Sequence, residues 1–486
     1  MKSTEPHQHL TTALCKSPPT RDYRRSAARK RLFFGSWMLC LFLLSPLSML
    51  AQTQGFSPAR EDSVLLAGLF KKYQQQYKVD LDKIPSKNKK DLVELYQLRW
   101  KNIQDKFDQK EIFTGTRAQE YLDRLVSVIR QGNPSVAAAN FSCYFSRSYI
   151  PNASYIGEGI ILFNMGLFEK LDDESQVAFV LCHEIAHYLL QHSENNIRQY
   201  VAAINSEEVQ AELRRIKGSA YGKREQLEKL VKGLTFYSRR HSRDHEAQAD
   251  SMAVELMRNT GFALPGALSA LALLDTIDKD SLNMSRCLPG LFNAPEYPFR
   301  SKWIAHDEGL LGGHAKINDG EMADSLKTHP DCRKRIGLLS SLMKGWSQPV
   351  AKRFVVDSIT FASLRNAFHY ETIEYAYLSD QYTESLFLTL GLLQTKTNDA
   401  YLITQVGRLL NSLYSAQKSH TLSRKTDLPS PGYPANYNLL LQFVQNLYLE
   451  DLAAISYYYL KQYHPQMDMY LPFRNTYQES EKLVKD

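Results

Sequence analysis

Apolar residues at helical spacing, three and four positions apart, predict three helices in the first third of the chain. The third of them ends at Gly132-Asn133-Pro134, where glycine and proline give a strong stop signal. We expect these helices to cover the front of a larger domain. Their predicted apolar faces are, in order, Val64, Leu65, Leu69, Phe70 and Tyr73; Leu92, Leu95, Tyr96, Trp100, Ile103 and Phe107; and Tyr121, Leu122, Leu125, Val128 and Ile129.

From Asn140 onward the hydrophobic period changes from helical spacing to two. Phe141, Cys143 and Phe145 alternate with polar neighbours, and further strands are predicted near residues 150–153 and 160–163. Together they predict a small antiparallel sheet. Its exposed edge could pair with the backbone of an extended substrate, while an ordinary sheet with a blunted edge explains the pattern equally well.

The sheet is followed by a helix that begins at the acidic run 172–175 and continues to about Gln191. Apolar residues fill its first half, so we expect it to be buried. The next stretch, 195–240, is polar and helical in pattern, with a break at 218–222. Its many charges are typical of solvated helix faces, and a flexible lid over a neighbouring cleft is a less favoured alternative.

After Trp346 and Pro349 the pattern is helical and rich in aromatic residues. Tyr382, Tyr414 and Tyr448 lie 32 and 34 residues apart. A period near 34 is typical of paired-helix TPR repeats, although a non-repetitive helical domain explains it equally well.

The pattern as a whole predicts an α+β fold that is mainly helical. The predicted segments are a leader over 1–51, a helical segment over 52–108, a central domain with the small sheet over 109–346, and an all-α, TPR-like or non-repetitive, domain over 350–486.

Composition places the 486-residue chain among globular proteins, with 43% hydrophobic and 23% charged residues. The formal net charge of +7 comes mostly from residues 1–51, which hold eight basic and two acidic residues, a balance of +6. Only +1 is left for the remainder. We therefore expect no nucleic-acid partner.

The leader has the layout of a secretory signal. A basic run, Arg21 to Arg31, precedes an apolar stretch from Leu32 to Leu50, and cleavage is predicted near Ala51. The apolar stretch is also long enough to remain as a membrane anchor. We expect an exported, periplasmic or envelope-associated protein, and cleavage and anchoring both stay open. No later apolar stretch reaches membrane-spanning length.

Candidate chemistry lies on the predicted buried helix, in His183-Glu184-Ile185-Ala186-His187. Two histidines four residues apart share one helix face and can bind one Zn²⁺. Glu184 points beside the metal, where its carboxylate can take a proton from water. The alternative is a core helix with polar interruptions.

A catalytic zinc site needs a third protein ligand, and the best candidate is Glu246. Glu246 and Asp250 are four residues apart and share a face of a helix predicted to open at this motif. Glu246 can bind the metal, while Asp250 can accept the free ring N–H of a ligand histidine. His245 is the competing ligand, but it faces about 100° away from Glu246 and has no carboxylate four residues on.

With HEIAH, the later EAQAD and Thr328-His329-Pro330, the chain resembles the gluzincin metallopeptidases of the CAAX prenyl protease, HtpX and Oma type. The likeness covers about residues 110–345 and is greatest for the soluble, exported BepA-like subgroup. The chain differs from the prenyl and HtpX proteases in lacking several membrane spans, which argues against a prenylated or intramembrane substrate. The 58 residues between His187 and Glu246 leave the width of the cleft open.

The resemblance implies roles for two further residues. His329 and Arg335 would approach the reacting centre and stabilise the oxyanion formed when water attacks a peptide carbonyl. In some members the histidine at this place also takes the open metal position and holds the enzyme latent. Spacing alone does not separate His329 from His306 or His314.

These observations predict an exported zinc-dependent endopeptidase that hydrolyses misfolded or misassembled envelope proteins. One Zn²⁺ per chain would be held by His183, His187 and Glu246, and Glu184 would act as the general base. Its partners would be protein or peptide substrates, with further proteins binding the C-terminal helices. The alternative is a chaperone-like assembly factor with a latent zinc site and a protein-binding tail.

Overall fold

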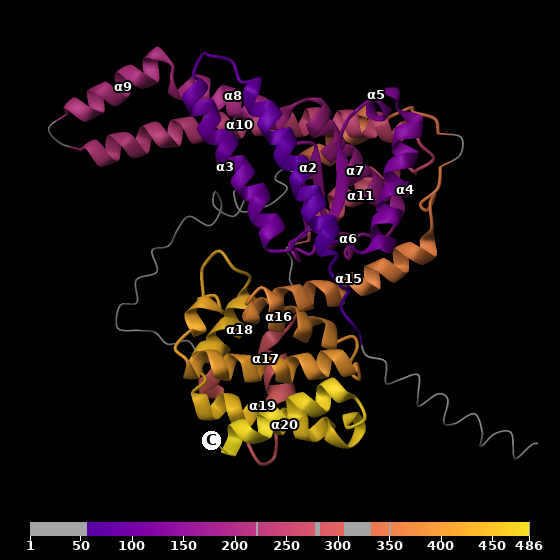
Figure 1. Ribbon diagram of the computed structural model, residues 1–486, viewed down its shortest axis with the longest axis vertical. Helices are drawn as coiled ribbons and strands as arrows, with labels where there is room; N and C mark the ends of the chain where they lie inside the picture. Colours follow the sequence, from indigo (N-terminus) through magenta and orange to yellow (C-terminus); the bar gives the residue numbers. More distant parts are fainter. Residues whose placement is uncertain (1–55, 220–221, 278–281, 306–331, 349–350, 486) are drawn as a thin grey trace, which may run out of the picture. The chain divides into compact units, whose positions relative to one another are not determined.

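A computed structural model describes residues 56–219, 222–277, 282–305, 332–348 and 351–485 (Figure 1). The predicted leader and His306, His314 and His329 lie outside these residues. Residues Gly55–Asp486 form one compact unit. Within the described ranges, no helix combines the length and the apolar character needed to cross a bilayer.

The fold is mainly helical with one small sheet, as predicted. Its three strands are β1 (Ser142–Ser146), β2 (Ala153–Gly157) and β3 (Ile160–Asn164), in the order β1-β3-β2. β2 and β3 are antiparallel, but β1 runs parallel to β3, with Ser142 opposite Ile160. The prediction of a purely antiparallel sheet is therefore wrong, because alternation of polar and apolar residues reports which face is buried and not the strand direction.

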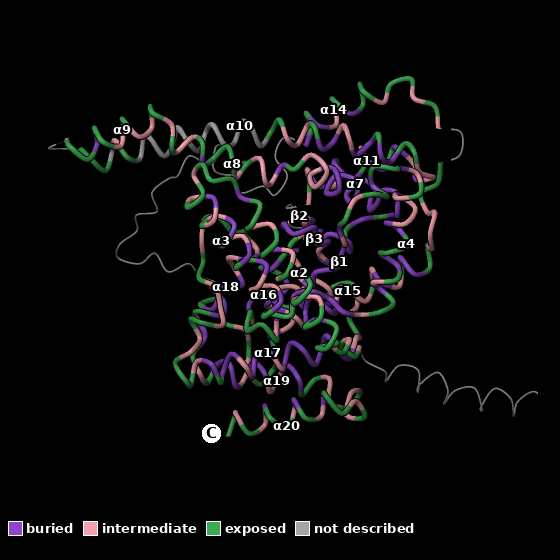
Figure 2. Tube along the Cα trace, turned by 45° about the horizontal axis from the view of Figure 1, so that its top comes forward, coloured by how far each residue is buried: buried purple, intermediate pink, exposed green. Residues whose placement is uncertain are grey.

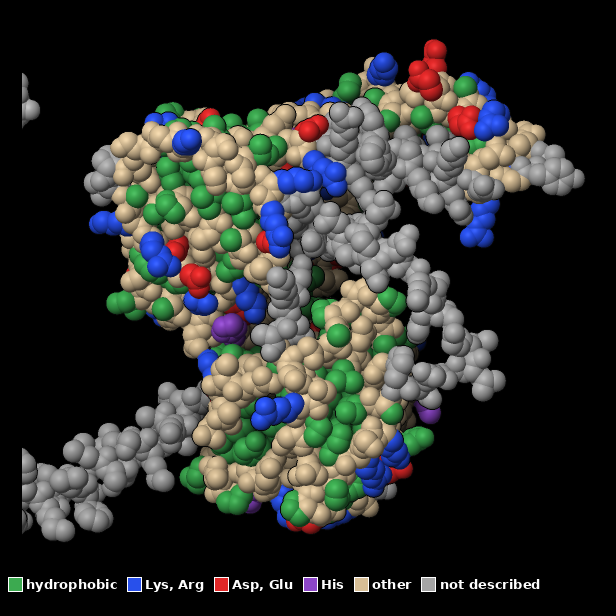
Figure 3. Space-filling view, turned by 180° about the vertical axis from the view of Figure 1, so that it is seen from behind, with side chains coloured by type: hydrophobic (Ala, Val, Ile, Leu, Met, Phe, Trp, Pro, Cys, Tyr) green, Lys and Arg blue, Asp and Glu red, His purple; other side chains and the backbone are tan. Residues whose placement is uncertain are grey.

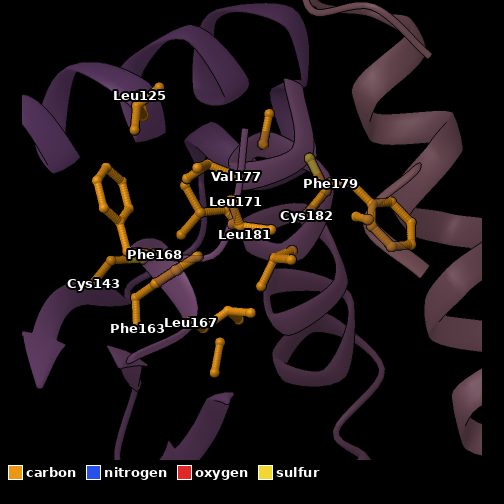
Figure 4. Close-up of a cluster of buried hydrophobic side chains, with 14 of the residues drawn as sticks. Leu125, Cys143, Phe163, Leu167, Phe168, Leu171, Val177, Phe179, Leu181 and Cys182 are labelled. Carbon is orange, nitrogen blue, oxygen red and sulfur yellow. The ribbon is translucent and has the colours of Figure 1, made fainter. Parts of the chain in front are cut away.

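The helix that carries the HEIAH motif, α7 (Glu174–Leu189), lies in the interior. It begins after Asp173, whose side chain accepts a hydrogen bond from the Gln176 N–H, and every residue from Glu174 to Ala186 is buried. It packs against α4, α10, α11 and β2. In Figure 4, Phe168 and Leu181 belong to the apolar cluster between α7 and α4, while Phe179 lies on the opposite side of α7.

The three predicted helices precede the sheet in the described part of the chain: α2 (Ser63–Asp82), α3 (Lys89–Asp108) and α4 (Thr116–Gly132). The short α5 (Pro134–Ala137) lies between α4 and the sheet. The predicted faces of α3 and α4 match their buried residues closely. The predicted face of α2 is wrong at its start, since Val64 and Leu65 are 82% and 45% exposed and Leu66 is buried. Three consecutive apolar residues allow more than one face, and the stacking of Tyr77 on Trp100 selects the observed one.

The polar stretch after α7 forms α8 (His192–Ile204) and α9 (Glu207–Gly218), and then α10 (Lys223–Arg258). The predicted break at 218–222 is confirmed. However, the EAQAD motif lies inside a helix of 36 residues and does not open one. Figure 2 shows α9 mostly exposed, whereas α7, β1 and β3 are mostly buried.

Two hydrophobic cores organise the remaining helices. α6 (Met165–Phe168), α11 (Pro265–Leu274) and α14 (Cys332–Leu342) belong to the core around α7. α12 (Met284–Phe292) and the 3-10 helix η1 (Ser301–Ile304) instead pack in the core of the C-terminal helices. Cys143, Cys182, Cys287 and Cys332 are buried, and none of these four is in a disulfide.

The C-terminal helices are α15 (Ser358–Leu378), α16 (Tyr382–Leu393), α17 (Ala400–Lys418), α18 (Ala435–Asn446), α19 (Leu449–Met467) and α20 (Leu471–Lys485), with the short η2 (Leu422–Arg424) after α17. α17 packs mainly against α16, α19 and α20, and α18 against α12, α16 and η1. This packing does not follow the tandem order of a TPR array. Tyr382 begins α16, Tyr414 lies within α17, and Tyr448 precedes α19, so the three tyrosines are not equivalent.

The long helix α15 belongs to both cores. Phe361, Leu364 and Phe368 pack in the core around α7, while Tyr370 and Ile373, further along the same helix, pack in the C-terminal core. A boundary drawn at residue 350 would therefore remove part of the core that supports α7.

Glu174, at the start of α7, fixes the segment that leads into α15. Its carboxylate is fully buried and accepts hydrogen bonds from the N–H groups of Val355, Val356 and Asp357 at 2.6, 2.7 and 2.7 Å. The Tyr121 hydroxyl donates a further bond at 2.8 Å. A single side chain thus satisfies three partly buried backbone donors that lie far away in the sequence.

We predict that Glu174→Ala lowers the free energy of unfolding by about 3 kcal/mol or more, because three backbone N–H groups lose their acceptor. Urea denaturation followed by circular dichroism measures the change. Glu120→Ala, at an exposed position of α4, is the control and should stay within about 0.5 kcal/mol of the wild type. Equal midpoints for the two variants would show that water replaces the carboxylate at no cost.

Candidate metal centre

Side chains from two packed helices converge on one point. His183 and His187 lie one turn apart on α7, and Glu246 comes from α10. The Nε2 atoms of the histidines are 3.0 Å apart, and Glu246 Oε2 and Oε1 lie 3.5 Å from His183 Nε2 and 3.4 Å from His187 Nε2. Ligands about 2.0–2.1 Å from a tetrahedral zinc ion are about 3.4 Å from each other. One donor atom from each residue, all within 4.8 Å of one another, thus forms a triangle that fits one zinc ion.

The charges around this triangle also favour a cation. Burial by itself would lower the pKa of His183, yet the carboxylates of Asp250 and Glu246 raise it to about 10. The pKa of Glu246 is held well below its usual value in spite of burial, because His183, His187 and Arg335 surround it. The buried Asp250 and the half-buried Glu246 thus stabilise positive charge at the imidazoles, as they would at a metal ion.

The orientation of His183 is fixed from behind by Asp250. His183 Nδ1 lies 2.9 Å from Asp250 Oδ1, which leaves Nε2 to face Glu246 and His187. Arg335 donates from Nε and Nη2 to the two oxygens of Asp250, both at 2.7 Å, and its Nη1 is 3.2 Å from Glu246 Oε2. Its guanidinium therefore holds both carboxylates in place. The oxyanion-stabilising role of Arg335 and of His329 stays a prediction, since His329 is outside the described residues.

His192, which the sequence analysis missed, supports His187. The Nδ1 atoms of His187 and His192 are 2.9 Å apart, and His192 Nε2 is 3.2 Å from Gln248 Oε1. If His187 offers Nε2 to a metal, its Nδ1 carries the proton and donates to His192, whose own proton is then on Nε2 and donates to Gln248. Burial, together with nearby His187 and His245, lowers the pKa of His192 to about 4, so the ring is neutral and can accept.

The competing ligand His245 lies away from the triangle of donor atoms. Its ring stacks on His192 with centroids 4.2 Å apart. The sequence feature that could have identified His192 is its position five residues after His187. Gln191, with φ of 53°, turns the chain after α7, so that α8 begins with His192 beside the metal centre.

The Glu184 side chain extends from α7 toward the edge strand β2. Its Oε2 accepts a hydrogen bond from the Tyr155 N–H at 2.8 Å, and burial raises its pKa above the usual value. A raised pKa makes the carboxylate a stronger proton acceptor, which suits a general base. The geometry thus combines three metal-ligand atoms with a nearby base at the edge of a sheet.

The comparison with known families agrees with this geometry. Residues 116–343 match the family model of Peptidase family M48. These residues belong to peptidase family M48. The match runs from α4 to α14 and contains every described residue of the metal centre, and M48 metallopeptidases are zinc-dependent. It does not distinguish the BepA-like subgroup, and no curated protein sequence matches the chain significantly.

We predict that His192→Ala weakens zinc binding about 10- to 100-fold, because the proton on His187 Nδ1 loses its acceptor. Competition against a chromogenic chelator measures the affinity. Asn196→Ala, at an exposed position of α8, is the control. Equal affinities for the two variants would show that His192 does not support the metal ligand.

Proposed function

We propose that this M48 peptidase is an exported, zinc-dependent endopeptidase that cleaves misfolded or misassembled envelope proteins. The peptidase class rests on the family. The observation that carries the mechanism is the triangle of His183, His187 and Glu246 donor atoms, at the spacing of zinc ligands, with the Glu184 carboxylate beside it. Export and the envelope substrates rest on the signal-like leader and the sequence resemblance.

When bound, zinc would polarise a water molecule and the scissile carbonyl. Glu184 would take the proton from the attacking water and pass it to the leaving amine. Asp250 and His192 would keep the ligand imidazoles in the required tautomers and orientations. Arg335 would keep Glu246 and Asp250 ionised and in place.

The edge strand β2 supports the binding of an extended substrate. The Tyr155 N–H points away from β3 and toward Glu184. A substrate carbonyl could replace the Glu184 carboxylate as the acceptor of this hydrogen bond. Such an exchange would release Glu184 for proton transfer as the substrate backbone pairs with β2. This mode reads the peptide backbone, which suits a protease that acts on unfolded chains.

A binding role for the C-terminal helices has a separate basis. Hydrophobic side chains gather on the face of these helices drawn in Figure 3. Exposed apolar residues in this part of the chain include Leu378, Tyr448, Met469 and Leu471. Exposed apolar clusters often mark surfaces that bind other proteins. We propose that these helices hold protein partners or substrates.

We predict that Glu184→Gln keeps the fold and about one zinc per chain but lowers proteolysis about 10²- to 10⁴-fold, because the variant cannot accept a proton. Cleavage of an unfolded protein by the zinc-loaded chain measures the loss, with Glu255→Gln, exposed on α10, as the control. Undiminished cleavage by Glu184→Gln would disprove the assignment of the base. Comparative proteomics of the exported fraction, wild type against Glu184→Gln, would identify the substrates.

The same variant tests the chaperone-like alternative. If Glu184→Gln restores the phenotype of a null strain as fully as the wild type, binding is the main activity. Truncation at residue 350 cannot serve this purpose, because Val355–Asp357 and the first half of α15 help to hold α7.

A further inference from the structure

A cavity of about 680 Å³ lies beside β2 and the end of α7, and none of the metal-ligand residues lines it. Its walls come from the ends of α2 and α7, from α3 and α8, and from the turn between β2 and β3. The volume is within the range of ligand-binding pockets, which is roughly 300–1,000 Å³. The predicted N-terminal helical segment therefore does more than cover the protease domain, because it forms one side of this cavity.

Tyr155 connects the cavity to the catalytic base. Its backbone N–H donates to Glu184, while its hydroxyl donates to Glu194 Oε1 at 2.9 Å, inside the cavity. Tyr188, the residue after His187, also lines the cavity and packs edge-on against the Tyr155 ring, with centroids 5.3 Å apart. A polypeptide lying along β2 at the metal centre could therefore place one side chain in the cavity.

Two carboxylates share one buried cation in this cavity. Arg99 donates to Glu158 Oε1 at 3.0 Å and to Glu194 Oε1 at 3.1 Å. The second oxygens, Glu158 Oε2 and Glu194 Oε2, are buried and have no hydrogen-bond partner among the described residues. Arg99 Nε also has no hydrogen-bond partner among the described residues. It lies against Gly157, and a Cβ at that position would be only 2.6 Å from Arg99 Nε. The inner wall therefore carries an excess of one negative charge.

The remaining charges lie nearer the solvent. Asp80 and Lys83 form a pair at 3.1 Å, with Lys83 67% exposed, and Arg198 is also exposed. Together these three residues give a net charge of +1 at the mouth of the cavity, where water and salt screen it. The buried excess is less screened and dominates the interior.

Glu158 occupies a costly position. With Gly159 it forms the two-residue turn between β2 and β3, and its φ of 50° is one that asparagine or glycine adopts more easily. Its side chain is nonetheless fully buried, and burial raises its pKa above the usual value in spite of Arg99. Backbone strain together with an incompletely paired buried charge is typical of functional positions.

We propose that this cavity is a substrate subsite that binds a lysine or arginine side chain of the polypeptide. The inference rests on the proposed endopeptidase function. The ammonium or guanidinium group would donate hydrogen bonds to Glu158 Oε2 and Glu194 Oε2. The aliphatic part of the side chain would pack against the Tyr155 and Tyr188 rings.

Peptide binding tests the proposal without catalysis. The zinc-loaded full-length Glu184→Gln chain is titrated with fluorescein-labelled decapeptides of a Gly/Ser/Ala scaffold that carry a single Lys, Arg or Met. We expect the Lys and Arg peptides to bind at least about tenfold more tightly than the Met peptide. Adding Glu158→Gln or, separately, Glu194→Gln should remove most of this difference. Adding Glu94→Gln, exposed on the same helix as Arg99, should leave it unchanged.

Equal affinities for the Lys, Arg and Met peptides would overturn the proposal, as would a preference that survives both glutamine substitutions. Using two separate variants guards against a folding defect at the strained Glu158 turn. Cleavage of a denatured protein by the wild type gives a second measure. A basic residue at a fixed distance from the cleaved bonds supports the subsite, and its absence overturns the subsite but leaves the peptidase intact. Selective binding without any cleavage would instead overturn the peptidase function alone.

Discussion

The packing of α7 against α10 is the constraint on which the protein depends. Metal ligands must be held to within a few tenths of an ångström, and here two come from one turn of α7 and the third from a residue 59 positions after His187. The burial of α7 on all sides removes its freedom to rotate or slide. Asp250, Arg335, His192 and Gln248 then fix the ligand side chains, so the positions of helices and of individual atoms are secured by different means.

The sequence was most informative where local chemistry determines structure. The acidic start of α7, the histidines one turn apart and the carboxylates of EAQAD identified the site before its geometry was known, because each depends on spacing within one helix. His192 was missed because its contact with His187 depends on the chain turn at Gln191 and not on helical spacing. The predicted start of the EAQAD helix was also wrong, since residues 223–245 contain no proline and α10 continues through them into the motif.

Long-range features were the least predictable. The parallel pairing of β1 with β3 and the face of α2 depend on partners elsewhere in the chain. The same holds for the two cores, because α12 and η1 pack with helices that follow them by about 140–150 residues, a choice that no local pattern encodes. The C-terminal part is helical, as its apolar pattern predicted. The order in which these helices pack shows, however, that the regular spacing of three tyrosines is no evidence of a tandem array.

The hydrogen bonds of the Glu174 side chain have a consequence for folding during protein synthesis. Its backbone partners begin 181 residues later in the chain. During synthesis the ribosome must therefore add everything from α8 to residue 357 before the Glu174 carboxylate can accept these three hydrogen bonds. Until then the carboxylate has no partners at residues 355–357, so a nascent or prematurely ended chain cannot have the finished framework around its metal ligands.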